Sequence, residues 1–206
     1  MVKQMDTDYK PYSTTNLPTK WGEFKTTAYR NNRGEEHLAI SFGLDKVSNS
    51  EVIPLVRIHS ACFTSEVLGS MKCDCREQLE YALEKIQKEG CGVVVYLFQE
   101  GRGIGLGAKI HAYSLQEKGK DTVDANTELG YAEDARTYEC AVDILKDLGI
   151  TKLKLLTNNP EKISAIDQAG FEWQREEIEV GLNEVNHGYL VVKKQRMGHL
   201  FSDKIN

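Results

Sequence analysis

Residues 76–98 read REQLEYALEKIQKEGCGVVVYLF and join a helical pattern directly to a strand pattern. Leu79, Ala82, Leu83 and Ile86 recur at the spacing of one helix face, and Gly90 is typical of the residue that ends a helix. The apolar run over residues 91–98 is short and continuous, which indicates a strand covered on both faces. A helix that leads straight into a buried strand predicts an α/β core.

The segments on either side extend this pattern. Upstream, residues 21–30 and 37–44 alternate as strands, and residues 51–60 are extended, with Pro54 indicating an edge or a bend. Downstream, the pattern predicts helices over 108–119 and 133–149, a loop over 121–130, a buried strand over 152–157, a helix opening at Pro160, and a strand with a short terminal helix within 186–201. We therefore expect a mixed α/β fold, with a β-rich N-terminal part followed by a mixed sheet flanked by helices.

The composition excludes several classes of protein. The 206 residues include 26 Lys and Arg against 31 Asp and Glu, a formal net charge of -5, which disfavours a protein that coats duplex nucleic acid. No run of about 18 apolar residues is present, and the polar N-terminus lacks the apolar stretch of a signal peptide. We expect a soluble cytoplasmic protein that binds neither a nucleic acid polymer nor a membrane.

Three of the five cysteines, Cys62, Cys73 and Cys75, fall within 14 positions, between the end of a strand and the start of a helix. Thiolates suit Zn²⁺, and three protein ligands leave a fourth position for water, as at a catalytic site. Two alternatives are a structural zinc with Cys91, Cys140 or a histidine as fourth ligand, and buried thiols without a metal. Three thiolates leave a net negative centre, so nearby cations or a general base would have to help it activate water.

A glycine-rich loop, EGRGIGLG, follows the buried strand over residues 100–107. Backbone N–H groups in such a loop approach anions closely, and Arg102 suits bidentate phosphate binding. The alternative is a flexible connector. Gly103, Gly105 and Ala108 also match a relaxed dinucleotide fingerprint, but four residues separate the strand from the first of these glycines, which disfavours an oxidoreductase.

Two shorter patterns have both a ligand-binding and a local structural interpretation. In TNNPEK, residues 157–162, Thr157 and Lys162 suit a phosphate or a base edge, whereas Asn158 or Asn159 suits a helix cap with Lys162 in solvent. Asp134 and Arg136 stand at the start of an expected helix, where a cap and a solvated side chain are the alternatives. Tyr113 is compatible with catalysis or with half-buried packing.

These patterns together favour one chemistry. An acidic protein places Arg57, His59, Arg102, Lys109, Arg136 and Lys162 on glycine-rich or junction segments. With a zinc site added, they predict metal-assisted hydrolysis of a phosphorylated substrate. A nucleobase deaminase would need H-x-E and P-C-x-x-C motifs, and neither is present.

Four strings in a fixed order carry a specific resemblance: RIHSACFTSEVLGSMKCDC (57–75), QEGRGIGLGAKIHAYSLQEKGKDTVDAN (99–126), LGYAEDAR (129–136) and LLTNNPEK (155–162). With LPTKWGEF near the start and MGHL near the end, the chain resembles GTP cyclohydrolase II over about residues 17–200. The resemblance implies a single GTP cyclohydrolase II domain over 1–206, with a flexible N-terminal segment (1–16), a β-rich part (17–50) and a catalytic α/β core (51–200).

The resemblance also implies the reaction: GTP is hydrolysed to 2,5-diamino-6-ribosylamino-4(3H)-pyrimidinone 5′-phosphate, formate and pyrophosphate, the first committed step of riboflavin biosynthesis. One Zn²⁺ per chain, held by Cys62, Cys73 and Cys75, would activate the water that attacks C8 of guanine. Mg²⁺ would neutralise the triphosphate, and the protein would be a homodimer.

Catalytic roles fall on three residues by the same resemblance. Arg136 would act on the α-phosphate as a nucleophile or by electrostatic stabilisation, Asp134 would accept a proton, and Tyr113 would serve ring opening. The implied GTP contacts are Arg57, Ile58, His59, Ser60, Ala61, Gln78, Glu100, Gly101, Arg102, Thr122, Thr157 and Lys162.

Two positions depart from the family pattern. Ala61 replaces a glutamate before the first cysteine, which removes a candidate proton shuttle. Arg76 replaces a glycine after the third cysteine, where it would tilt the helix start or add positive charge near the phosphates. Two alternative functions therefore stay open: a related GTP hydrolase that stops at the formylated product or serves another pathway, and an inactive GTP-binding homologue with structural zinc.

Overall fold

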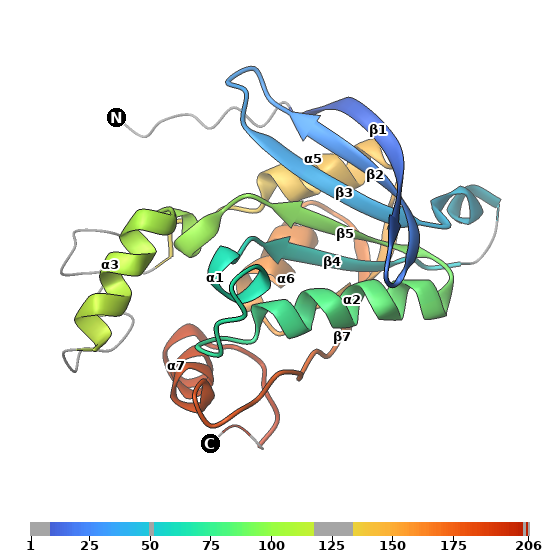
Figure 1. The fold of residues 1–206 in the computed structure, drawn as a ribbon. Coiled ribbons are helices and arrows are strands. Elements are labelled where there is room, and N and C mark those ends of the chain that lie inside the picture. Colours follow the sequence, from blue (N-terminus) through green and yellow to red (C-terminus); the bar gives the residue numbers. More distant parts are fainter. Residues whose placement is uncertain (1–8, 50–51, 118–133, 204, 206) are drawn as a thin grey trace.

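A seven-stranded mixed sheet organises the computed structural model, which describes residues 9–49, 52–117, 134–203 and 205 (Figure 1). The strands are β1 (Lys10–Thr19), β2 (Gly22–Arg30), β3 (Glu36–Phe42), β4 (Leu55–Ser60), β5 (Gly92–Leu97), β6 (Lys152–Leu156) and β7 (Glu172–Glu176). The helices are η1 (Leu44–Asn49), α1 (Phe63–Glu66), α2 (Cys75–Glu89), η2 (Glu100–Gly103), α3 (Leu106–Gln116), α5 (Glu139–Asp147), α6 (Pro160–Gln168) and α7 (His187–Met197). The mixed α/β class expected from the sequence is confirmed.

The sheet has an antiparallel part and a parallel part, in the strand order β1-β2-β3-β5-β4-β6-β7. Strands β1, β2 and β3 pair antiparallel, as short connections allow. Strand β3 pairs antiparallel with β5, whereas β5, β4, β6 and β7 are mutually parallel and are joined through helices. The β-rich N-terminal strands and the helix-flanked strands thus share one continuous sheet.

Helices cover both faces of the parallel strands (Figure 1). Helix α2 buries Leu83 and Ile86 against Leu55 of β4 and Val94 of β5. Helices α5 and α6 pack on the opposite face, where alternate strand residues such as Val56, Ile58 and Val95 form the larger cluster. Since both faces are covered, β5 is almost continuously apolar, which is the pattern that the sequence showed for this strand.

The chain reverses direction across the sheet at β4. The connection from β4 through α2 leads to β5 on one side, and the connection from β5 through α5 leads to β6 on the other. In open α/β sheets, the carboxyl ends of strands at such a reversal form the binding crevice. The sheet order therefore places a ligand site beyond Ser60, Leu97 and Leu156.

The end of α2 is as the sequence predicts. Gly90 has φ +78°, a left-handed conformation that favours glycine, and its N–H bonds the carbonyl of Ile86 at 2.9 Å. No helix among the described residues is long and apolar enough to cross a membrane.

Three local predictions need correction. The helix expected over 133–149 begins only at Glu139, because the residues before it approach the glycine-rich loop. The strand expected near the C-terminus is wrong, because residues 187–197 form helix α7, which places Leu190 in the core. Residues 10–16, expected to be flexible, form most of β1, because their Thr and Tyr side chains favour a strand paired with β2. Strand β7 was not predicted.

Candidate active site

A cavity of about 550 Å³ lies at the carboxyl ends of the parallel strands. Its size is typical of a small-molecule site. Most of the residues singled out in the sequence line it: Arg57, His59, Ser60, Ala61, Cys62, Cys73, Cys75, Gln78, Glu100, Gly101, Arg102, Tyr113, Arg136, Thr157 and Lys162. The tertiary structure therefore brings four separate sequence motifs to one place.

Two expected site residues that the structure describes do not line the cavity, and a third falls outside the described part of the chain. Ile58 is fully buried in the core, and its backbone carbonyl accepts a hydrogen bond from Lys162 Nζ at 2.9 Å. Asp134 lies behind Arg136 and binds its guanidinium. Thr122 lies outside the described residues.

The three cysteines converge as a metal site requires. Their sulfur atoms all lie within 4.8 Å of one another, and Cys62 Sγ is 3.6 Å from Cys73 Sγ. Tetrahedral Zn–S bonds of 2.3 Å would place two sulfurs about 3.8 Å apart. The residues present therefore fit Zn²⁺. Among the described residues, neither Cys91 nor Cys140 joins this group, which removes them as fourth ligands.

The charge on the three thiols is unevenly shared. Hydrogen bonds from Cys73 and Cys75, followed by one from Lys109, lower the pKa of Cys62. The same contact with Cys62 raises the pKa of Cys73 and, together with burial, that of Cys75. Negative charge thus gathers first on Cys62, the sulfur that has a cation beside it.

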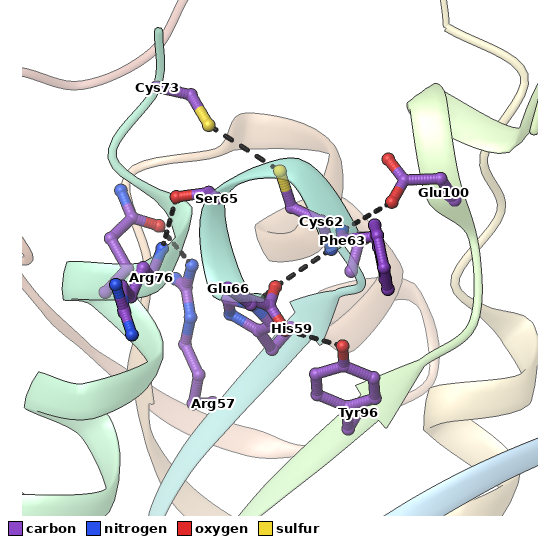
Figure 2. Close-up of polar contacts among 12 residues, drawn as sticks. Arg57, His59, Cys62, Phe63, Ser65, Glu66, Cys73, Arg76, Tyr96 and Glu100 are labelled. Atoms are coloured by element: carbon purple, nitrogen blue, oxygen red, sulfur yellow. Dashed lines mark hydrogen bonds and ion pairs between the residues drawn. The ribbon is translucent and has the colours of Figure 1, made fainter. Parts of the chain in front are cut away.

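Glu66 holds the backbone that carries Cys62 (Figure 2). Its Oε1 atom accepts a hydrogen bond from the N–H of Cys62 at 2.9 Å and lies 2.9 Å from His59 Nε2. Its Oε2 atom accepts one from the hydroxyl of Tyr96 at 2.6 Å. Because Glu66 does not line the cavity, it does not restore the carboxylate that Ala61 removes.

A second polar network links the cysteine loop to β4 and α7. Arg57 donates to Leu156 O at 2.9 Å and to the Gln78 side chain, which in turn donates to Asp74. Asp74 is 2% exposed and accepts a hydrogen bond from Lys193 at 2.9 Å. Although burial opposes ionisation of this carboxyl, Lys193 lowers its pKa. The residue between two of the cysteines is thereby fixed to the C-terminal helix.

The glycine-rich loop folds back on the segment that contains Asp134. Arg102 has φ +59°, an uncommon conformation for a residue other than glycine, and its carbonyl accepts a hydrogen bond from Ala135 at 3.1 Å. Gly103 has φ +87°, and a Cβ atom there would lie 3.3 Å from the Ala135 backbone. This close approach places Arg102 and Arg136 at the same cavity.

The structure decides between the local interpretations of Asp134 and Arg136. Asp134 does not cap a helix, because α5 begins five residues later, at Glu139. Its carboxylate binds Arg136, whose side chain is only 13% exposed. Burial opposes the charge on Arg136, but the hydrogen bonds to Asp134 raise its pKa. The guanidinium is therefore held protonated.

In the TNNPEK segment the helix cap is confirmed, but the solvent-exposed Lys162 that was expected with it is not. Asn159 caps α6, because its side chain accepts hydrogen bonds from the N–H groups of Glu161 and Lys162. Lys162, however, is not in solvent: it is 5% exposed and faces the cavity. Burial, together with Arg57, Arg136 and Lys193, lowers its pKa well below the usual range.

The remaining departure, Arg76, has a local partner. Its Nε lies 3.6 Å from Glu80 Oε1, one turn along the regular helix α2, and its side chain is 44% exposed. Arg76 does not line the cavity, so the positive charge expected near the phosphates is not placed there.

Helix α3 supplies two residues that the sequence analysis singled out, Lys109 and Tyr113, whereas the residues from α7 and the segment after it were not placed in the site. On α3, Lys109, Ala112 and Tyr113 share one face at helical spacing. Tyr189 and Lys193 of α7 also line the cavity, as do His199 and Phe201. The MGHL string contained the only signal for His199, whose burial and cationic neighbours lower its pKa to about 3.

The cavity is strongly basic although the chain is acidic. Seven Lys and Arg side chains line its described part, together with a single carboxylate, that of Glu100: Arg57, Lys72, Arg102, Lys109, Arg136, Lys162 and Lys193. Such a concentration of cations in a protein with net charge -5 favours a polyanionic ligand.

Comparison with known proteins gives consistent matches. The family model described as GTP cyclohydrolase II matches residues 10–177. The chain is 52% identical over 192 residues to riboflavin biosynthesis protein RibBA of Aquifex aeolicus (strain VF5), covering 92% of this chain and 47% of that protein. It is 50% identical over 187 residues to GTP cyclohydrolase-2 of Helicobacter pylori (strain Shi470), covering 89% and 94%. The chain thus spans about half the length of the first relative and most of the second.

A solved structure also matches, that of a two-domain 3,4-dihydroxy-2-butanone 4-phosphate synthase from A. baumannii. The TM-score is 0.49 and the sequence identity 22%, over 87% of this chain and 41% of that one.

Proposed function

Because the chain belongs to the GTP cyclohydrolase II family, we propose that it opens the guanine ring of GTP in riboflavin biosynthesis. The products would be 2,5-diamino-6-ribosylamino-4(3H)-pyrimidinone 5′-phosphate, formate and pyrophosphate. Two hydrolyses remove C8 as formate, and a third cleaves the bond between the α- and β-phosphates.

One observation carries this proposal. Three convergent thiols and seven Lys and Arg side chains line the same cavity. One substrate that carries a polyphosphate group and reacts with the help of a metal would use both sets of side chains. Cys62, Cys73 and Cys75 would hold Zn²⁺, which supplies a Lewis acid when bound. Mg²⁺ bound to the triphosphate would neutralise part of its charge. The cationic side chains of the cavity would then mainly orient the triphosphate.

Tyr113 would act at the ring. Burial raises the pKa of its hydroxyl to about 12, so Tyr113 keeps its proton at neutral pH. Lys72 lies 4.8 Å from the centre of its ring. A protonated phenol in this position is suited to donate to a ring nitrogen as the C–N bond breaks.

Arg136 would act at the α-phosphate by electrostatic stabilisation. Its guanidinium is held protonated by Asp134 and lines the cavity, and a protonated guanidinium is a poor nucleophile. Asp134 would fix its orientation. Arg57, Arg102, Thr157 and Lys162 would bind the rest of the nucleotide.

The experiment is an incubation of zinc-loaded protein with GTP and Mg²⁺, with formate, pyrophosphate and nucleotide mass measured together. Equal formate and pyrophosphate with the diaminopyrimidine phosphate would support the full reaction. Pyrophosphate with a formylated, ring-opened product would favour the related hydrolase that stops early. Bound GTP with neither product would favour the inactive homologue.

The zinc requirement has its own variant. Cys73→Ser is expected to lose the bound metal and formate release, measured by metal analysis and by formate assay. Cys91→Ser is the matched control, because Cys91 lies outside the sulfur group. Full formate release by Cys73→Ser without metal would contradict a zinc-dependent reaction.

The homodimer and the cytoplasmic location stay predictions. Helix α1 and the segment after it leave Phe63, Val67, Leu68 and Met71 between 44% and 68% exposed, which is compatible with a partner on that side. Light scattering of the purified protein would give the oligomeric state.

A further inference from the structure

Lys109 lies against one of the three sulfurs. Its Nζ atom is 3.0 Å from Cys62 Sγ and 2.8 Å from Glu100 Oε1. Both charged side chains are largely buried, with 13% of Lys109 and 16% of Glu100 exposed. An ammonium at this distance donates a charge-assisted hydrogen bond to a thiolate.

Building on the proposed function, we propose that Lys109 is a positioning residue for the metal, whose ammonium offsets the charge that three thiolates bring to Zn²⁺. Three thiolates and one Zn²⁺ carry a net charge of −1, and the ammonium of Lys109 sets one positive charge directly against the Cys62 sulfur. A hydrogen bond to the Cys62 sulfur also withdraws electron density from it. The metal therefore stays a stronger Lewis acid toward its fourth ligand.

Glu100 fixes the two partners relative to each other. Its Oε1 atom also accepts a hydrogen bond from the N–H of Gly101 at 2.8 Å, and its Oε2 atom accepts one from the N–H of Phe63 at 2.6 Å. Phe63 directly follows Cys62, and Figure 2 shows its contact with Glu100. One carboxylate therefore joins the segment after β5, the start of α1 and the side chain of Lys109. Glu100 therefore holds the Lys109 ammonium next to the Cys62 sulfur.

The other cations of the cavity have different contacts. Lys72 lies over the ring of Tyr113 at 4.8 Å, Arg57 binds Gln78 and a backbone carbonyl, and Lys162 binds the carbonyl of Ile58. Among the described cations, Lys109 is the one whose hydrogen bond to a cysteine sulfur the structure shows. The contact with sulfur separates the role of Lys109 at the metal from the role of the other cations, which are available to bind phosphate.

The test uses Co²⁺ in place of Zn²⁺, because the sulfur-to-cobalt charge-transfer band reports the electron density on the ligating thiolates. Wild type, Lys109→Met, Lys109→Arg and the control Lys72→Met are compared. Lys109→Met keeps an unbranched side chain one atom shorter and removes its charge, and Lys72→Met removes a cation from the same cavity.

We expect Lys109→Met to shift the charge-transfer band to lower energy, Lys109→Arg to restore much of the shift, and Lys72→Met to keep the wild-type band. Formate release by zinc-loaded Lys109→Met should fall by about 10- to 100-fold. Failure of Lys109→Met alone to bind Co²⁺, with Lys109→Arg binding as wild type, would also support the proposal, because Lys109→Arg restores the positive charge.

An unchanged band in Lys109→Met would overturn the proposal, as would an equal shift in Lys72→Met or a loss of Co²⁺ binding by both Lys109 variants. If wild type shows no thiolate-to-cobalt band, the metal site itself is absent and the proposed function fails first. The two failures are therefore distinguishable.

Discussion

Arg136 and Asp134 form a forked ion pair two residues apart in the chain, with Arg136 Nε 2.9 Å from one carboxylate oxygen of Asp134 and 3.1 Å from the other. Arg136 NH1 lies 3.5 Å from Ser60 Oγ, at the end of β4. The pair thus aims a fixed positive charge at the cavity.

Removing that charge should suppress cleavage of the phosphate chain. We expect Arg136→Ala to lower pyrophosphate release by about 10²- to 10³-fold, the effect of deleting one donor to a developing anion. Arg136→Lys should retain an intermediate rate. The matched control is Arg30→Ala, which removes an exposed arginine paired with Glu36. Pyrophosphate release by Arg136→Ala at the rate of the control would assign Arg136 no part in the reaction.

Restoring the missing carboxylate tests the departure at position 61. Ala61 lines the cavity, and its N–H is bonded to Leu97 O at 2.8 Å, so a longer side chain there extends from a fixed backbone. We expect Ala61→Glu to release formate as fast as wild type or faster. Ala61→Gln adds the same bulk without charge. A large loss of activity in both variants would mean that the cavity has adapted to alanine.

The buried pair of Lys193 and Asp74 should contribute to stability. Lys193→Met leaves the Asp74 carboxylate without its cation, which should lower the free energy of unfolding by about 3–5 kcal/mol. Lys88→Met breaks an exposed pair with Glu84 and should cost less than about 0.5 kcal/mol. Urea unfolding at one zinc concentration measures both. Equal losses of unfolding free energy in the two variants would show that the buried pair stabilises the fold no more than the exposed pair does.

Three histidines make stability depend on pH. Burial is the first cause of a lowered pKa at His37, His59 and His199, and the pKa of His199 falls to about 3. Below about pH 6.5 the unfolded chain binds protons that the folded chain does not, so stability is full above that pH and falls as the pH drops.

We therefore expect the free energy of unfolding to decrease between pH 7.5 and 5.5, and His199→Gln to reduce that slope by up to about 1.4 kcal/mol per pH unit. His111→Gln, which replaces an exposed histidine, is the control. Urea midpoints across this range give the slopes. A slope for His199→Gln equal to that of wild type would show that His199 is not held neutral.

Local patterns predicted much of the fold because their causes are local. The spacing of Leu83 and Ile86 and the glycine at position 90 set both the buried face and the end of α2. Prediction failed where distant contacts outweigh local preference. Residues 134–138 would extend α5, but the bond from Ala135 to Arg102 draws the chain away from it. The local pattern of α7 predicts a strand, but the segment forms a helix that buries Leu190 in the core.

The sequence by itself determined helices α2, α3 and α6, the central strands and the cysteine cluster, because periodicity and short spacing act within a few turns of chain. Only the tertiary structure placed Lys109 on Cys62, 47 residues away, and Lys193 on Asp74, 119 residues away. Those contacts depend on the strand order, which brings the carboxyl ends of β4, β5 and β6 to one edge. Nothing in the local pattern encodes that order, because it depends on how the apolar faces of distant helices pack on the sheet.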